Sequence, residues 1–516
     1  MAGLFLAAGL ALFPFFRQAL FVDDHAHFEQ AERIAWTGGG PYSKTAGGLG
    51  WVKGQIPGEA NGPVYLMAVG GLIRLLGDEV SVVRLALFPL HLAGVFSVYF
   101  LARRFVRRPF LASLVWLVSP HVWLTTNSLL VDAMLASLVS IGICLWVEGW
   151  ERDSDLLLAG GAFFQGLSFL VKYTGLISIA VSLIWILLWS KRRFHGKSLW
   201  LSIPVGMGVG WFLWSRSFYG ESHFLAVARG SLSFHGGDRW VTLAAFATAT
   251  TPILALAGIK NLLTNKPARV GALGAFLAAG ILAPFTDMIT TFGLCALASL
   301  FVVALWPAAP DADRAPGEGW LRSWILLGVV GLWAARGWVC ARYLVVIGIP
   351  LVLLSLQVLE SWRFWGKIGR SALWGLIVYG GCLAAANFQQ AAVDPWAIKE
   401  VQKKFGRDTS VQWFFPAATL SGLPYYGAKA GWRPLKPGED IPPGGRLLLP
   451  ARRLPKVFWP NTQGAAVLGT FSAPRGLPFR LLGSKAGFYG SIWGPRPFGF
   501  SLEPVEKFYI FETSNE

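Results

Sequence analysis

The chain has 516 residues, of which 54% are hydrophobic and only 14% are charged. A soluble globular domain carries nearer a quarter charged residues, so this composition argues against an ordinary soluble enzyme. The net charge of +17 is divided among short loops between apolar stretches and the C-terminal tail, a distribution that membrane topology explains without a nucleic-acid partner.

The first apolar stretch, residues 4–22, predicts a transmembrane helix. It has no basic segment before it and no small-residue cleavage site after it, so we expect a retained helix rather than a signal peptide.

A dense group of ionisable side chains follows this helix. The group contains Asp23, Asp24, His25, His27, Glu29 and Glu32. Apolar residues recur through it at helical spacing, which predicts a short amphipathic helix along the membrane surface. Asp24 would lie at or just before the first residue of that helix.

Three roles remain open for these side chains. Asp24 could cap the amphipathic helix, because a carboxylate accepts hydrogen bonds from unpaired amides at a helix start. A carboxylate at the water boundary could instead act as a general base on an acceptor hydroxyl. A divalent cation held by Asp23, Asp24, His25 and His27 is the third reading, although their spacing matches no recognised ligand pattern, so no cofactor is firmly predicted.

The loop that begins with this group, residues 23–79, is rich in glycine and longer than a connection needs to be. Lys53 is a candidate for binding a lipid phosphate as a point charge, or else a solvated surface lysine. Glu59 precedes the turn Asn61-Gly62-Pro63-Val64-Tyr65 and is a second polar candidate in the loop.

Hydropathy predicts about thirteen membrane spans, because the apolar stretches have the length that crosses a hydrocarbon core. They lie near 3–22, 80–101, 110–125, 128–147, 156–171, 173–190, 198–216, 241–259, 268–284, 286–306, 323–339, 343–359 and 371–388.

Basic residues concentrate in alternate loops, above all in 103–109 and 191–197. The positive-inside rule therefore predicts a cytoplasmic N-terminus in the inner (plasma) membrane. With an odd number of spans, a membrane domain of residues 1–388 would be followed by an extracytoplasmic domain of residues 389–516.

Several polar residues of the predicted spans fall near the outer boundary. They are Asp132, Lys172, Tyr173, Arg336, Arg342 and Tyr343. Ionisable groups at membrane depth are expensive and need a partner or a polar cavity. They could anchor span ends by reaching toward water, or converge around an anionic headgroup.

The tail differs from the spans in having short apolar runs between Pro and Gly residues. The runs 446–449, 465–471, 479–482 and 508–511 predict strands. We therefore expect a small α+β or mainly β domain.

The order of these features resembles the family-39 membrane glycosyltransferases, which include protein O-mannosyltransferases and the aminoarabinose transferases of bacterial lipid A. The residues that carry the resemblance are Asp23-Asp24 with Phe28, Asn61-Gly62-Pro63-Val64-Tyr65, Val131-Asp132, Gly166-Leu167, Val171-Lys172-Tyr173-Thr174-Gly175, Arg342-Tyr343 before Pro350, and Tyr489-Gly490 with Trp493-Gly494-Pro495 and Pro497-Phe498.

The resemblance implies a mainly α, polytopic GT-C membrane fold and an inverting sugar transfer from a polyprenyl-phosphate donor to a lipid, glycan or protein acceptor. It also implies that a first-loop Asp is the base. The spacing to Phe28 favours Asp24, in which case His25 replaces the family's usual second acid; the acidic pair itself favours Asp23. The phosphate-binding Lys of the aminoarabinose branch would correspond to Lys53 or to Asn61.

Two other functions remain open at this point. A transporter or lipid flippase would be expected to show inverted repeats and polar groups at mid-membrane depth. An enzyme resembling an O-antigen polymerase or ligase would more naturally carry a large catalytic loop late in the chain. No dinucleotide-binding or phosphate-binding glycine motif is present in the sequence.

Overall fold

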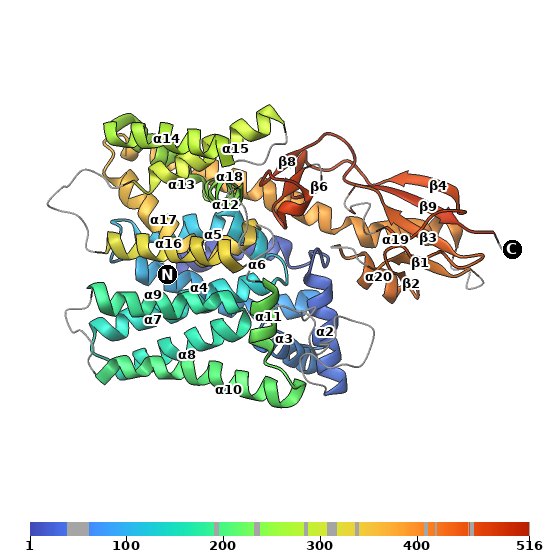
Figure 1. The fold of residues 1–516 in the computed structure, drawn as a ribbon, viewed down its shortest axis with the longest axis horizontal. Coiled ribbons are helices and arrows are strands. Elements are labelled where there is room, and N and C mark those ends of the chain that lie inside the picture. The colour runs from blue at the N-terminus through green and yellow to red at the C-terminus, as the bar shows by residue number, and fades with distance from the viewer. Residues whose placement is uncertain are drawn as a thin grey trace.

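The computed structural model describes residues 1–38, 61–189, 196–231, 238–282, 287–306, 317–335, 340–406, 411–417, 421–452, 454, 459–483 and 485–514. It is mainly helical, and its strands lie in the C-terminal tail. Figure 1 shows the helices gathered in one bundle and the tail projecting from one end of it.

The N-terminal half of the bundle follows the apolar pattern of the sequence. Its helices are α1 (Ala2–Leu12), α2 (Asp24–Thr37), α3 (Pro63–Leu76), α4 (Val80–Ala102), α5 (Pro109–Val118), α6 (Pro120–Thr126), α7 (Val131–Glu151), α8 (Asp155–Val171), α9 (Leu176–Ile184), α10 (Ser202–Tyr219) and α11 (His223–Ser231). Short 3-10 turns follow α1 and α8, at Phe13–Phe15 and Tyr173–Gly175.

The second half continues as helices into the tail. Its helices are α12 (Asp238–Thr250), α13 (Pro252–Thr264), α14 (Lys266–Leu282), α15 (Met288–Ala304), α16 (Glu318–Ala335), α17 (Val345–Glu360), α18 (Trp365–Ala391) and α19 (Val393–Phe405). The 3-10 turn η5 (Ala341–Leu344) leads directly into α17. The predicted amphipathic helix is present as α2, with Asp24 as its first residue.

Two predicted spans are not continuous helices. The segment 110–125 divides into α5 and α6 at Ser119–Pro120, and 241–259 divides into α12 and α13 at Thr251–Pro252, where the axis turns by 102°. In both cases proline has no backbone N–H to donate and disfavours a helical residue before it, so the helix ends there.

Four described helical segments are long and apolar enough to cross a membrane: Val80–Ala102, Val131–Glu151, Ala341–Glu360 and Trp365–Phe405. The bent pair Arg239–Thr250 and Pro252–Thr264 would be a fifth. Most other predicted spans correspond to shorter apolar helices, so the figure of about thirteen stays a prediction.

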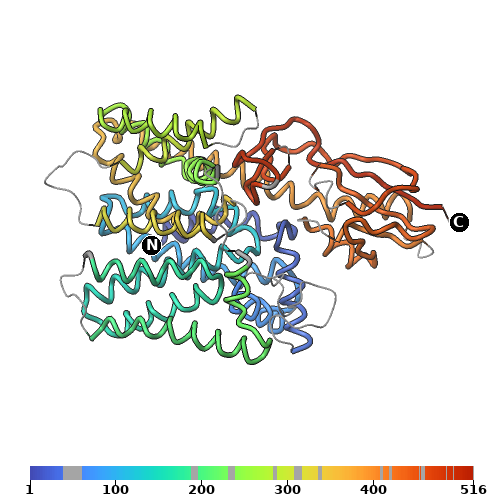
Figure 2. The backbone as a smooth tube through the Cα atoms, in the orientation of Figure 1, coloured from blue at the N-terminus to red at the C-terminus, as the bar shows by residue number. Residues whose placement is uncertain are grey.

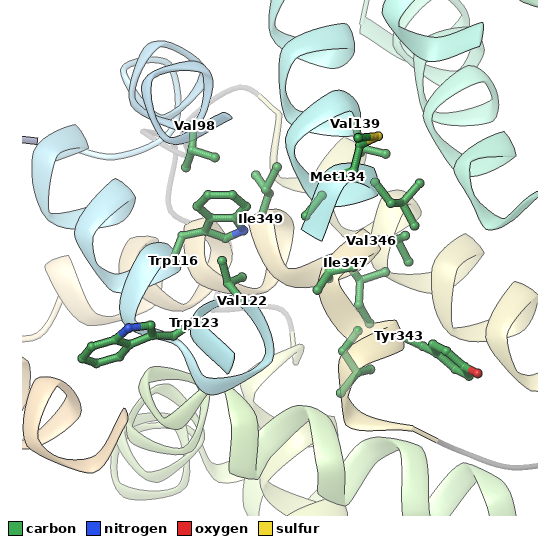
Figure 3. Packing of buried hydrophobic residues seen from close by; sticks show 14 of the residues in the cluster. Val98, Trp116, Val122, Trp123, Met134, Val139, Tyr343, Val346, Ile347 and Ile349 are labelled. Carbon is green, nitrogen blue, oxygen red and sulfur yellow. The ribbon is translucent and has the colours of Figure 1, made fainter. Parts of the chain in front are cut away.

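The bundle core centres on α7 and α17, whose apolar windows are each 89% buried. Large side chains such as Trp116 and Trp146 are fully enclosed in it. Figure 3 shows Trp116 of α5 beside Ile349 of α17, with Met134 and Val139 of α7 in the same cluster and the Tyr343 hydroxyl pointing away from this packing. The centre is therefore apolar, and the polar groups described below lie at its edge.

The described tail contains a five-stranded mixed sheet in the order β2-β1-β3-β9-β4. The strands are β1 (Trp413–Pro416), β2 (Arg433–Leu435), β3 (Arg446–Pro450), β4 (Ala466–Ser472) and β9 (Lys507–Glu512). β1 pairs in parallel with β2 and β3, whereas β9 is antiparallel to β3 and β4. Helices α19 and α20 (Leu423–Lys429) accompany the sheet, so the tail is α+β.

The predicted strand 479–482 is instead two short strands in different ribbons, β5 (Phe479–Arg480) and β6 (Leu482–Gly483). β5 pairs with β8 (Gly499–Phe500), and β6 pairs with β7 (Ala486–Gly487). This part of the tail turns back onto the bundle (Figure 2), and Phe488 and Tyr489 join its core cluster.

Candidate functional site

Five of the candidate side chains meet at the start of α7 and the end of α8. Lys172 Nζ lies 2.5 Å from Asp132 Oδ1, and Arg342 Nε lies 3.8 Å from Asp132 Oδ2. Arg342 also pairs with Asp23 through its Nη2. The ring of Tyr343 lies under both cations, 4.2 Å from Lys172 Nζ and 5.4 Å from Arg342 Cζ. We call this set the paired network.

Local structure positions each member of the paired network. Asp132 is in the first turn of α7, where a carboxylate suits the helix dipole. Lys172 directly follows α8, and Arg342 and Tyr343 belong to η5. Gly62 closes the arrangement, because its N–H donates to Val171 O at 3.0 Å and a side chain there would collide with the Leu170 backbone.

The backbone before the two aspartates is strained. Val22 has a φ of 57°, a left-handed conformation that a β-branched residue rarely adopts. Such strain persists only where the surroundings impose it, and it is commonly found at functional sites.

Asp23 is the paired carboxylate. Burial by itself would raise its pKa, but the charge and hydrogen bond of the adjacent Arg342 guanidinium, together with the nearby histidines, outweigh burial and lower the pKa of Asp23 to about 2. Asp23 is therefore ionised at neutral pH and is a weak base.

Asp24 is the unpaired carboxylate. It is completely buried, and neither of its oxygens makes a hydrogen bond of ordinary geometry to a described residue. Burial raises the pKa of Asp24 to about 6, although Arg84, then His27 and, more weakly, the nearby Leu129 backbone oppose the shift. A carboxylate with this pKa and free oxygens is suited to accept a proton near neutral pH.

Arg84, on α4, is the cation that acts on Asp24. Its Nη1 donates to the carbonyl of Phe16, at 3.0 Å, and to that of Gln18, while Nε and Nη2 have no described partner. Arg84 thus holds the chain between α1 and α2 and leaves part of its guanidinium without a hydrogen-bond partner among the described residues. We call Asp24 and Arg84 the unpaired couple.

A chain of neutral polar groups borders this region. Tyr489 Oη donates to Asn387 Oδ1 at 2.7 Å, and Gln18 Nε2 donates to Ser128 Oγ at 3.0 Å. The tail segment is fixed beside the paired network, because the Tyr489 carbonyl accepts from Cys340 Sγ at 2.8 Å. The end of the chain therefore helps to enclose a site built by its beginning.

The two histidines of α2 point in different directions. His25 Nδ1 donates to Val22 O at 2.6 Å, and burial lowers the pKa of His25, so its ring is neutral. His27 Nε2 accepts from Asn61 Nδ2 at 3.2 Å, and its ring meets the edge of Tyr65.

No group of three or more His, Cys, Asp or Glu residues in the described part of the chain could hold a metal ion. The described residues therefore give no support to the cation site of Asp23, Asp24, His25 and His27, which stays an untested prediction. Three of these side chains have other partners, since Asp23 pairs with Arg342, His25 bonds to Val22 O and His27 bonds to Asn61.

Tyr173 lies beside Lys172 but faces a different group. Its hydroxyl is 2.5 Å from His223 Nδ1 and accepts from Trp211 Nε1 at 2.9 Å. The candidates Lys53, Glu59 and Arg336 lie outside the described residues.

Sequence reasoning missed Arg84, His223, Asn387 and Tyr489 as site residues. Arg84 could have been found, because an arginine four residues into an apolar helix needs a partner. The others carry no such signal, because an isolated polar or aromatic residue in a helix or loop is usually explained by packing or by interfacial anchoring.

Comparison with known families gives a match to part of the chain. Residues 60–214 match the family model described as dolichyl-phosphate-mannose-protein mannosyltransferase. The resemblance predicted from the sequence is thereby confirmed, and the matched segment contains Arg84, Asp132, Lys172 and Tyr173. No curated protein matched the chain.

Solved structures of membrane glycosyltransferases are similar to the chain at low identity. The apo ArnT protein of Cupriavidus metallidurans is 15% identical, with a TM-score of 0.48 and 84% of each chain covered. The same protein bound to undecaprenyl phosphate is 13% identical, with a TM-score of 0.46 and coverage of 87% of this chain and 92% of that one. The apo oligosaccharyltransferase of Archaeoglobus fulgidus is 11% identical, with a TM-score of 0.44 and coverage of 84% and 64%.

Proposed function

We propose that this protein is an integral membrane glycosyltransferase that moves a sugar from a polyprenyl-phosphate donor to an acceptor hydroxyl on the extracytoplasmic face. The observation that carries the proposal is the match of residues 60–214 to the mannosyltransferase family model. The segment that matches supplies Asp132 and Lys172, which lie in the same charged site as Asp23. The acceptor is a lipid, glycan or protein hydroxyl.

Asp24 is the general base in this proposal. Its carboxylate is buried with both oxygens free of described partners, whereas Asp23 is held by Arg342. Asp24 takes the proton of the acceptor hydroxyl, the acceptor oxygen bonds to the anomeric carbon, and the bond from that carbon to the phosphate oxygen breaks. Attack opposite the leaving phosphate inverts the configuration.

Lys172 and Arg342 stabilise the phosphate as negative charge develops on it. Both cations are already neutralised by carboxylates, so the phosphate has to join or replace one of these partners. The Asp23 side chain is 26% exposed and that of Asp132 only 2%, which makes Asp23 the partner that a phosphate can reach.

In the proposed topology the protein lies in the inner membrane and its N-terminus is in the cytoplasm. About thirteen spans then bring residues 389–516 to the outer side. The paired network, the unpaired couple and the attached tail segment share one end of the bundle, which agrees with a single extracytoplasmic site.

The test is transfer of radiolabel from a panel of polyprenyl-phosphate sugars in membranes that contain the wild type or a variant. We expect Asp24→Asn to lower transfer by about 10²- to 10⁴-fold, the usual contribution of a general base. Glu29→Gln is the matched control, because Glu29 lies on the same helix with its side chain exposed.

A folded Asp24→Asn protein that transfers as well as the wild type would remove Asp24 as the base. If Asp23→Asn alone abolished transfer while remaining folded, the role would pass to Asp23. A wild type that never transfers label from a broad donor panel but moves an unmodified lipid across the bilayer would favour the flippase alternative.

A further inference from the structure

The β5–β8 ribbon exposes large apolar side chains at the edge of the bundle. Phe500 is 66% exposed and Leu502 is 74% exposed. Phe479 lies opposite Phe500 in the ribbon, and their rings meet edge to face at 6.4 Å. Adjacent exposed apolar side chains of this size usually mark a surface that another phase or molecule covers.

The ribbon is attached to the last turn of α18. The Leu477 N–H donates to Gln389 Oε1 at 2.7 Å, and the Leu481 N–H donates to Gln390 Oε1 at 3.2 Å. Gln390 Nε2 in turn donates to the Phe479 carbonyl at 3.3 Å. These bonds fix the height of the ribbon along the helix.

The same helix presents an apolar stripe to its surroundings. Trp374 is 67% exposed and Val378 is 61% exposed, and both lie on the face that continues to the exposed Gln389. Fifteen residues separate Trp374 from Gln389, a rise of about 22 Å along an α-helix. Trp374 and Val378 therefore lie roughly 16 to 22 Å along the helix from the point where the ribbon is attached, a distance within a hydrocarbon core about 30 Å thick.

We propose that the β5–β8 ribbon is a membrane-surface element, with Phe500 and Leu502 inserted in the interfacial layer of the lipid bilayer. The argument is continuity, since the exposed face of α18, a helix with the length and composition of a span, leads directly to the ribbon. Aromatic side chains are favoured at this depth, between hydrocarbon and water. This inference does not depend on the transferase proposal.

Contact of the ribbon with lipid would also affect the rest of the tail. The segment after the ribbon's first strand contains Tyr489, whose carbonyl is bonded to Cys340 beside the paired network. Insertion of Phe500 and Leu502 would hold this segment against the bundle from the lipid side.

The test places an environment-sensitive fluorophore on a single cysteine at Phe500→Cys or, independently, at Leu502→Cys. Cys144, Cys295 and Cys340 are buried, and the partly exposed Cys382 is changed to Ala in all variants. The full-length proteins are reconstituted in lipid nanodiscs that contain phosphatidylcholine with a nitroxide at a shallow acyl carbon. Val467→Cys is the control, because Val467 is 55% exposed on β4, in the part of the tail that projects farthest from the bundle (Figure 1).

We expect the nitroxide lipid to quench the probes at positions 500 and 502 and to leave the probe at position 467 unchanged. Aqueous iodide should quench in the opposite order. If both ribbon probes respond to iodide as strongly as the control and ignore the nitroxide, the proposal is wrong. Shielding from both quenchers, with dependence on protein density, would also overturn it in favour of contact with a second copy.

Discussion

The paired network and the unpaired couple lie at the same end of the bundle and differ in how their buried charges are satisfied. In the paired network, Asp23, Arg342, Asp132 and Lys172 alternate in sign. In the unpaired couple, neither carboxylate oxygen of Asp24 and neither Nε nor Nη2 of Arg84 has a hydrogen-bond partner among the described residues. The difference teaches that charge pairing can build the frame of a site, while a neighbouring buried carboxylate, the base in our proposal, is left unsatisfied at a cost in stability.

The largest expected effect on stability comes from removing Arg342 from the paired network. Arg342→Gln would leave Asp23 and the buried Asp132 without their shared guanidinium, and removing one partner of a buried ion pair typically costs about 3–5 kcal/mol. Thermal unfolding of the detergent-purified protein measures the loss. Arg342→Lys keeps the positive charge and should lose less stability than Arg342→Gln. If Arg342→Gln were as stable as the wild type, Arg342 would not be holding the paired network together.

Asp24→Asn, by contrast, should stabilise the folded protein at neutral pH. Because the pKa of Asp24 rises from 3.8 in the unfolded chain to about 6 in the folded protein, its ionised form destabilises the folded state above pH 6. That cost is on the order of 3 kcal/mol at neutral pH and fades as pH falls from 6 to 4.

The measurement is the difference in unfolding temperature between Asp24→Asn and wild type, taken at pH 7.5 and at pH 4.5. We expect the variant to be more stable at pH 7.5 and the difference to shrink at pH 4.5. A variant that is less stable than wild type at pH 7.5 would show that ionised Asp24 is held by interactions we have not identified.

The smallest expected effect tests whether Arg84 controls the pKa of Asp24 within the unpaired couple. Arg84 lowers the pKa of Asp24, so Arg84→Gln should raise that pKa further. The acid limb of the pH profile of the transfer rate would then move to higher pH, by about one unit or less. The pH profile of transfer checks this, with Arg84→Lys as the charge-conserving control; an unchanged profile in Arg84→Gln would separate Arg84 from the base.

Much of the local structure could be predicted from the sequence, since hydrophobic periodicity encodes helices directly. The amphipathic α2 and most helices of the bundle are examples. The helix break at Thr251–Pro252 was signalled by the proline, but its 102° bend depends on packing. The β1 strand has no alternating pattern, because all four of its residues are buried.

For the candidate site, the sequence by itself determined which chemistry is present: two adjacent carboxylates after the first helix, and cations near the outer ends of later helices. Only the tertiary structure decided their partners, since Arg342 pairs with Asp23 across 319 residues and leaves Asp24 to Arg84. The physical reason is that helix formation depends on neighbours a few residues apart, whereas the energy of a buried charge depends on whatever distant groups the fold brings within a few ångströms.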